Sequence, residues 1–352
     1  MKFWMMVMFV IGAGANSSGT DHNGEEHKAL CNLLKVAVWR WGTSGEGLSQ
    51  PLRAALGRTI FGDPDGGSLE TWGSKVPEDY DVVEKIHSSR SFLCGFPKEG
   101  GRYKRFKQVR WPGHSAPHDL VCLCTTGEGG YPVNGARDSS PVATLCEKTK
   151  EALGGGTKGW SNTEGEEEVG KAQIGKTWEV IVTECLKKGE KAGDLKSSLQ
   201  EFKGKLVEKR HNAYEKQVRE NMEHELVTLY TNRYQLGEGI PTEEDACSGS
   251  PPLGVCVMYY NATKIKEYTP WWSELEKALL LEEEEERKAR SENEVDKDKK
   301  QKLKVPDAPR PTNQSQTPNT ENSTAIFSIL NMTSGTPITP PCSWLLSATI
   351  LI

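Results

Sequence analysis

Residues 31–42 read CNLLKVAVWRWG, and this stretch decides the class of fold. Apolar side chains recur in and beside it at intervals of three and four residues, at Leu30, Leu33, Leu34, Ala37, Val38 and Trp41. Such spacing places them on one face of an amphipathic helix. Gly42 and the glycine-containing stretch after it end the pattern. The sequence therefore predicts a mainly α-helical protein with this helix packed against its core.

Further helical patterns follow along the chain. Ser49 can cap a second helix that has Pro51 in its first turn. From Glu166 to about Leu236 the apolar spacing of three and four returns, with breaks expected at the glycines near residue 190. Two or three long helices with matching apolar faces predict an elongated antiparallel bundle or coiled coil.

The segments between these helices have a different character. Residues 62–165 are rich in glycine and proline, lack a regular period and contain four cysteines, which predicts a loop-rich head lobe held by disulfides. Residues 237–268 read as another loop, in which Cys247 and Cys256 could form a local disulfide. Thr269 and Pro270 then begin a charged helix over 269–290. Residues 291–334 predict a disordered, glycosylated stalk.

The two ends of the chain indicate the secretory pathway. Lys2, the apolar run Phe3–Ile11 and the Ala13-Gly14-Ala15 triplet have the order of a signal peptide over 1–15. At the other end, small residues at 334–336 precede a short spacer and an apolar terminus, so 335–352 reads as the signal for a glycosylphosphatidylinositol (GPI) anchor. Ser334 is the preferred attachment residue, with Gly335 and Asn331 as alternatives.

Removal of both ends changes the number of cysteines. Of the nine in the chain, Cys342 leaves with the C-terminal signal. The even set that is left predicts disulfides among Cys31, Cys94, Cys122, Cys124, Cys146, Cys185, Cys247 and Cys256, with their pairing open. Secretion also gives meaning to the Asn-x-Ser/Thr sequons, of which Asn261, Asn313 and Asn322 are better acceptors than Asn16 and Asn331.

Composition excludes several classes of function. The formal net charge of −5 gives no sign of nucleic-acid binding, and no internal apolar run is long enough for a polytopic membrane protein. The glycine clusters lack the Lys-Ser/Thr of a phosphate-binding loop, and the acidic runs at 164–168 and 282–286 read as solvated surface. We therefore expect no catalytic residues, no metal site and no cofactor.

Two other clusters have a functional and a structural interpretation. Cys122 and Cys124 with His114 and His118 could bind zinc, but an oxidising compartment favours disulfides and surface histidines. The basic and aromatic residues of 98–111, KEGGRYKRFKQVRW, could face an anionic ligand, although a solvated loop is the simpler interpretation. The tryptophans at 39, 41, 178, 271 and 272 are expected to pack in a core.

Taken together, these stretches resemble the variant surface glycoproteins of African trypanosomes, and most closely the shorter type without a large separate C-terminal domain. The resemblance rests on CNLLKVAVWRWG at 31–42, TIFG at 59–62, PHDLVCLCT at 117–125, GW at 159–160, KTWEVIVTECL at 176–186 and PWWSELEKAL at 270–279. The signals at both ends frame these motifs, so that the resemblance covers essentially the whole chain.

The resemblance implies a helical N-terminal domain over 16–268 that forms an elongated homodimer, with its head outward and its C-terminus toward the membrane. It implies a GPI-anchored coat on the outer leaflet of the plasma membrane that evades host antibodies by antigenic variation. One alternative is a GPI-anchored nutrient receptor on a related scaffold, for which residues 98–111 are the only candidate ligand site. An extracellular enzyme is the other, and it would need a pocket of perturbed carboxylates or histidines.

Overall fold

The computed structural model describes eleven stretches of the chain and divides it into two units, Met1–Asp296 and Lys297–Ile352. The described residues are 19–84, 89–97, 108–134, 143–155, 157, 159–162, 167–188, 193–210, 232–242, 245–260 and 269–302. The proposed signal peptide, the anchor residue Ser334, the three preferred sequons and the basic segment 98–107 lie outside them. Among the described residues, no helix has both the length and the apolar content needed to cross a bilayer.

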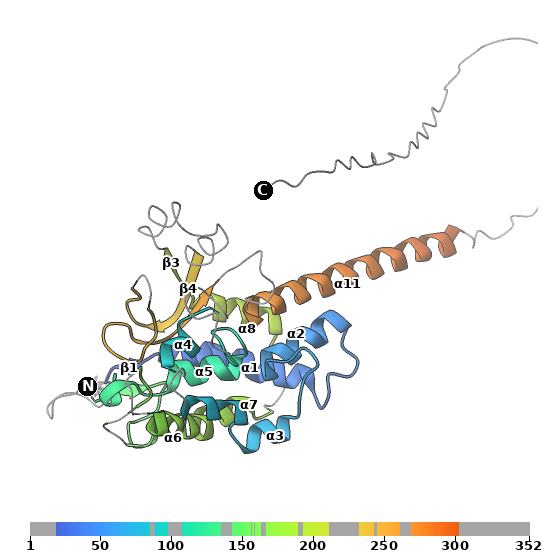
Figure 1. Ribbon diagram of the computed structural model, residues 1–352. Coiled ribbons are helices and arrows are strands. Elements are labelled where there is room, and N and C mark those ends of the chain that lie inside the picture. The colour runs from blue at the N-terminus through green and yellow to red at the C-terminus, as the bar shows by residue number, and fades with distance from the viewer. Residues whose placement is uncertain are drawn as a thin grey trace, which may run out of the picture. The chain divides into compact units, whose positions relative to one another are not determined.

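The first unit is largely helical (Figure 1). It begins with strand β1 (Asp21–His22) and helix α1 (Gly24–Trp41), whose six apolar positions named above are all buried, as the spacing predicts. Helix α2 (Gln50–Phe61) follows Ser49 and has proline in its first turn, again as expected. Both helices end at glycines with positive φ, Gly42 and Gly62, a conformation that glycine adopts without steric cost.

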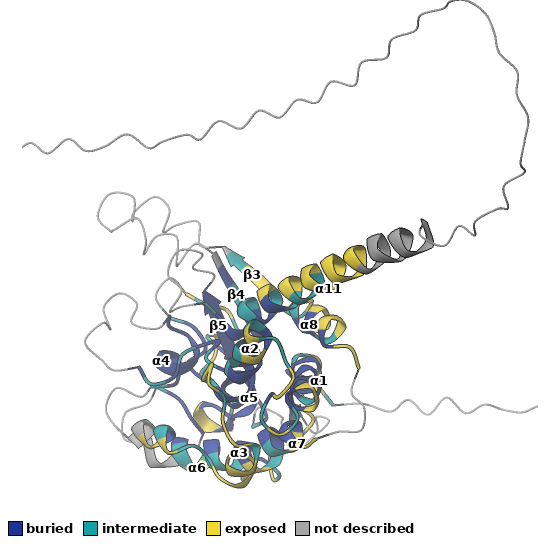
Figure 2. Ribbon diagram, turned by 90° about the vertical axis from the view of Figure 1, so that its right-hand side faces the viewer, coloured by how far each residue is buried: buried dark blue, intermediate teal, exposed yellow. Residues whose placement is uncertain are grey.

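The segment expected to form a head lobe contributes the most deeply buried helix of the unit. It contains α3 (Leu69–Ser74), the 3₁₀ helix η1 (Glu78–Glu84), α4 (Arg90–Cys94), α5 (Ala116–Cys124), the 3₁₀ turn η3 (Glu128–Gly130) and strand β2 (Thr144–Leu145). All nine residues of α5 are buried, and this helix packs against α1, α2, α4 and the sheet. The described residues of 62–165 therefore share the core with the helices before and after them (Figure 2).

The prediction of helix from Glu166 to Leu236 is correct for its first half and wrong for the described residues of its second half. Helix α6 (Glu167–Thr177), the π-helical turn η4 (Trp178–Val182) and α7 (Thr183–Leu186) follow one another directly, and α8 (Leu195–Lys203) comes after a break. The chain then turns at Gly204 and continues as strand β3 (Val207–Arg210). Residues 232–236 also lie in a strand, and 211–231 are outside the described residues.

A three-stranded antiparallel sheet replaces part of the expected bundle and of the expected loop. Strand β4 (Asn232–Glu238) lies between β3 and β5 (Val255–Tyr260), with Gln235 opposite Val207 on one side and Met258 on the other. Every residue of β5 is buried, and this strand packs on α5. The β-branched and aromatic sequence of β5, VCVMYY, is typical of a buried strand and explains why residues 237–268 are not simply a loop.

Helix α11 (Trp271–Lys302) ends the described part of the chain. Its first turns bury Trp271, Trp272, Leu275 and Ala278 against the core. It continues past residue 290, so the expectation that disorder begins at Ser291 is wrong for residues 291–302. The reason lies in the sequence, because neither glycine nor proline occurs between Trp271 and Val305 and most residues there favour helix.

Candidate functional site

All eight predicted cysteines form disulfides in the structure, and every bond lies within the first unit. Cys31 in α1 is bonded to Cys185 in α7, and Cys247 is bonded to Cys256 in β5. The other two bonds, Cys94–Cys122 and Cys124–Cys146, both hold α5. Sequence reasoning left the pairing open apart from the possible local bond between Cys247 and Cys256, which the structure contains.

Disulfide bonds occupy both cysteines of the possible zinc site. Cys122 and Cys124 are bonded to different partners, so neither offers a thiolate to a metal ion. His118 is fully buried in α5, contrary to the expectation of a surface histidine. A second group, His27 with Cys31 and Cys185, has its ligand atoms within 4.8 Å of one another, but its two sulfur atoms are likewise joined to each other.

Asp119 joins three elements of the fold through its carboxylate. Oδ2 accepts hydrogen bonds from the Tyr259 hydroxyl in β5 at 2.8 Å and from the Trp271 indole in α11 at 2.7 Å. Oδ1 accepts from the backbone N–H of Gly113 at 3.0 Å. Burial raises the pKa of Asp119 to about 7, against the opposing effect of these three donors. The carboxylate therefore ties α11 and the sheet to α5.

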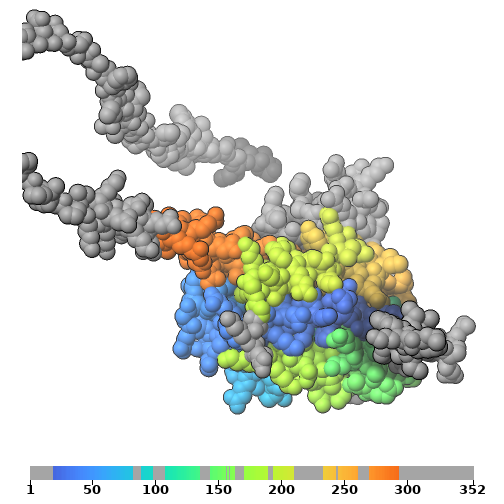
Figure 3. Space-filling view, turned by 180° about the vertical axis from the view of Figure 1, so that it is seen from behind, coloured from blue at the N-terminus to red at the C-terminus, as the bar shows by residue number. Residues whose placement is uncertain are grey.

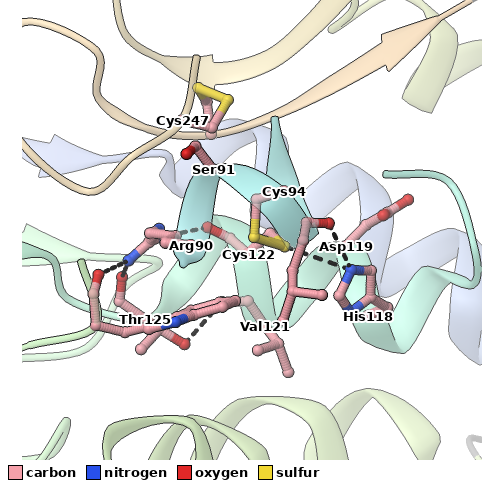
Figure 4. The surroundings of a disulfide bond; sticks show 12 residues. Arg90, Ser91, Cys94, His118, Asp119, Val121, Cys122, Thr125 and Cys247 are labelled. Atoms are coloured by element: carbon pink, nitrogen blue, oxygen red, sulfur yellow. Dashed lines mark hydrogen bonds between the residues drawn. A yellow bond between two sulfur atoms is a disulfide. The ribbon is translucent and has the colours of Figure 1, made fainter. Parts of the chain in front are cut away.

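Arg90 has a matching role at the other end of α5 (Figure 4). Its guanidinium is fully buried and donates to the backbone carbonyls of Cys122 at 2.6 Å, Thr125 at 2.8 Å and Trp160 at 3.0 Å. It also lies over the Trp160 ring at 5.1 Å. Burial lowers the pKa of Arg90 to about 9. The cation satisfies carbonyls at the C-terminus of α5, where the helix dipole favours positive charge.

His118 is held on both sides of its ring. The Leu93 carbonyl can only accept, so Nε2 of His118 donates to it at 3.0 Å, and Nδ1 accepts from the Tyr80 hydroxyl at 2.8 Å. This pattern fits a neutral imidazole, and burial lowers the pKa of His118 to about 3. Asp119, Arg90 and His118 thus each hold a separate set of buried hydrogen bonds around α5, and together these contacts are called the buried polar network.

Two grooves run beside α11, away from this network. One has a volume of about 620 Å³ and lies between α1, the start of α8 and α11, where Trp39 and Glu286 line it. The other, of about 310 Å³, lies between α2 and α11. Ion pairs Arg40–Glu282 and Arg58–Glu274 cross the corresponding seams at 2.8 and 2.7 Å. The neighbouring α1 and α8 run side by side across this face of the unit (Figure 3).

The described part of the basic and aromatic segment belongs to the core. Arg110 is buried, pairs with Asp79 at 3.0 Å and lies over the Tyr80 ring at 4.6 Å. Gln108 is buried and donates to the Phe92 carbonyl at 2.6 Å. These contacts give the end of the segment a structural role that alternating basic and aromatic residues did not reveal.

The tryptophans expected in the core are found there with one exception. Trp41, Trp178, Trp271 and Trp272 are buried, whereas Trp39 is 37% exposed beside the larger groove. Sequence reasoning did not identify Arg90 or Asp119 as important, although both lie close to the quoted cysteines. A charged residue within an otherwise apolar stretch, as in Leu-Val-Cys-Leu-Cys after Asp119, was the available signal.

Comparison with known proteins identifies the family. The model of the trypanosomal VSG domain, the domain of variant surface glycoproteins, matches residues 43–301. No curated protein and no solved structure matches the chain. The matched stretch contains most of the elements that pack against α5, three of the four disulfides, and all of α11 except its last residue. The chain belongs to the trypanosomal VSG domain family.

Proposed function

We propose that this protein is a GPI-anchored coat glycoprotein that shields the cell surface and takes part in antigenic variation. The observation that carries the proposal is the family match over residues 43–301, because proteins with this domain form surface coats. Antigenic variation and evasion of host antibody are properties of a set of variant coat proteins, and we propose that this chain is one of them. Its partners would be a second copy of the chain, the anchor lipid and host antibodies.

The ends of the sequence support anchoring. A signal peptide over 1–15 would direct the chain into the secretory pathway, and residues 335–352 would be exchanged for the GPI lipid at Ser334. The four disulfides fit an oxidising compartment. Glycans on Asn261, Asn313 and Asn322 would cover the chain near α11 and along the segment that follows it.

The proposed layout keeps the sequence-based domains, except that the charged helix runs to Lys302 and the stalk begins after it. Residues 16–268 would form the helical N-terminal domain with a head lobe over 62–165, followed by the charged helix and a glycosylated stalk up to residue 334. An elongated helical homodimer is part of this proposal. The exposed Trp39, Leu280 and Leu281 beside the grooves of α11 supply apolar surface of the kind that such an association buries.

A scaffold role agrees with the chemistry of the described residues. Three titratable groups with strongly shifted pKa values, Asp119, His118 and Arg90, are fully buried and are hydrogen-bonded to elements of the fold. The described end of its candidate segment gives the receptor alternative no support, because Gln108 and Arg110 face the core. We therefore propose a structural protein that is not an enzyme.

The anchor can be tested in trypanosomes that express the full chain or a chain ending at Ser334. We expect the full chain on the cell surface, with its C-terminal peptide carrying the anchor's ethanolamine on Ser334 by mass spectrometry. The shortened chain should appear in the medium. A full-length surface protein that still contains residues 336–352 would contradict the proposed anchor.

A further inference from the structure

The second half of α11 differs from its first half in its surroundings. The first turns of α11 are held by the core and by an ion pair to α2. Ion pairs from Glu282 to Arg40 in α1 and from Glu283 to Lys196 in α8 follow. From Glu284 to Glu292 every residue is exposed, while the backbone stays helical (Figure 2). A helix that is polar on all sides cannot be stabilised by burial of an apolar face.

Contacts within the helix provide the stability that the core does not. Glu284 pairs with Lys288 at 2.8 Å, and Glu286 reaches Arg290 at 3.7 Å. Both pairs have spacing i,i+4 with glutamate on the N-terminal side, which is the favourable order for the helix dipole. The pKa of Glu284 is lowered and that of Lys288 is raised, in each case mainly by their shared hydrogen bond.

The exposed part of α11 lies between the folded core and the chain that leads to the proposed anchor in the sequence. Within the first unit it covers Glu284–Asp296, thirteen residues that begin where the docked turns of α11 end. Beyond it the chain leads toward the proposed attachment residue, Ser334. At a rise of about 1.5 Å per residue, thirteen helical residues extend about 20 Å. A coil of the same length would have no fixed extension.

We propose that Glu284–Asp296 is a self-supporting rigid helix that spaces the folded body from the chain leading to the anchor. Its intrahelical ion pairs replace the tertiary contacts that stabilise other helices. The proposal rests on the anchored coat function for its biological meaning, and on the exposure of Glu284–Glu292 and the two ion pairs among them for its physical basis. A rigid spacer would keep the body at a set distance from its lipid without an additional folded domain.

The test measures the distance between two spin labels on the secreted, soluble chain. Nitroxides carried by ketone-containing amino acids at positions 281 and 296 leave the four disulfides intact. Because fifteen residues of helix span about 22 Å, we expect a single narrow distribution near that distance. Arg287→Pro should broaden it at least about twofold by breaking the helix. Arg287→Ala, the matched control, should leave it narrow because alanine favours helix.

A wild-type distribution as broad as that of Arg287→Pro would overturn the proposal. Arg287 is exposed, so both variants should unfold at the same temperature as wild type, which separates a local effect from loss of the fold. The experiment uses the protein without lipid. Its failure therefore leaves the proposed anchor standing, and failure of the anchor test leaves the rigid helix standing.

Discussion

The indole nitrogen of Trp271 lies 2.7 Å from Asp119 Oδ2, and this hydrogen bond joins the first turn of α11 to the buried helix α5 across 152 residues of sequence. Tyr259 of β5 donates to the same oxygen atom. One buried carboxylate thus sets where the C-terminal helix meets the body. The attachment of α11 should depend on this network as well as on the apolar contacts of Trp271, Trp272 and Leu275.

Asp119→Asn should change how stability depends on pH. The folded chain keeps a proton on Asp119 up to about pH 7, whereas the unfolded chain loses it near pH 4, so this group makes wild-type stability fall as pH rises between those values. The full effect is on the order of 4 kcal/mol. Urea unfolding from pH 4.5 to 8 should show the stability of wild type falling relative to that of the variant as pH rises. Equal slopes would contradict the raised pKa.

His27→Gln should have the opposite effect in acid. Burial lowers the pKa of His27 to about 4, so between pH 6.5 and 4 the unfolded chain binds a proton that the folded chain does not. His27 should therefore lower wild-type stability as pH drops through this window, so the stability of wild type should fall relative to that of the variant. The unfolding free energies of the two proteins should run parallel above pH 7.5. Parallel curves down to pH 4 as well would show that His27 is not the group concerned.

Arg90→Met should destabilise the fold more than Arg58→Met. Removal of the buried guanidinium leaves several carbonyls at the end of α5 without a donor, which costs about 1–3 kcal/mol for each unsatisfied group. Arg58 forms a partly exposed ion pair with Glu274, and its loss should cost about 1 kcal/mol or less. Thermal unfolding of both variants gives the comparison. A similar loss of thermal stability in both variants would contradict the stabilising role of Arg90.

Replacement of Cys31 and Cys185 by alanine should cost more stability than replacement of Cys247 and Cys256. The first bond spans 154 residues and the second spans 9. Loop-closure entropy then predicts a difference of about 2 kcal/mol, after allowance for the two bonds nested inside the longer loop. Denaturant titration of the two double variants measures it directly. An equal cost would indicate that native-state contacts, and not the unfolded chain, determine the effect.

Local patterns in the sequence predict the helices well and the sheet poorly. The apolar positions of α1 lie three and four residues apart, so one segment contains all of the information needed. Strands β3, β4 and β5 are short, and the pairing of β4 with β3 and with β5 joins residues that are 17 to 28 positions apart in the sequence. The segment Tyr234–Leu236 fitted a helical period by chance, while its neighbours Val255–Tyr260 were read as loop.

The buried polar network was beyond sequence reasoning for a related reason. Cys122 and Cys124 drew attention to α5. The structural role of Asp119, however, depends on hydrogen bonds from Tyr259 and Trp271, which only the fold brings near. Arg110 was read as part of a basic surface because its partner Asp79, in the 3₁₀ helix η1, lies far from it in the sequence. Charge patterns along a sequence do not show which charges become buried.

The central claim is that this chain is the coat of the cells that express it, and its abundance tests that claim most directly. Intact cells would be treated with GPI-specific phospholipase C, and the released proteins would be quantified by mass spectrometry. We predict that this chain dominates the released material and begins near Asn16. Release in trace amounts beside a different dominant protein would contradict a coat role.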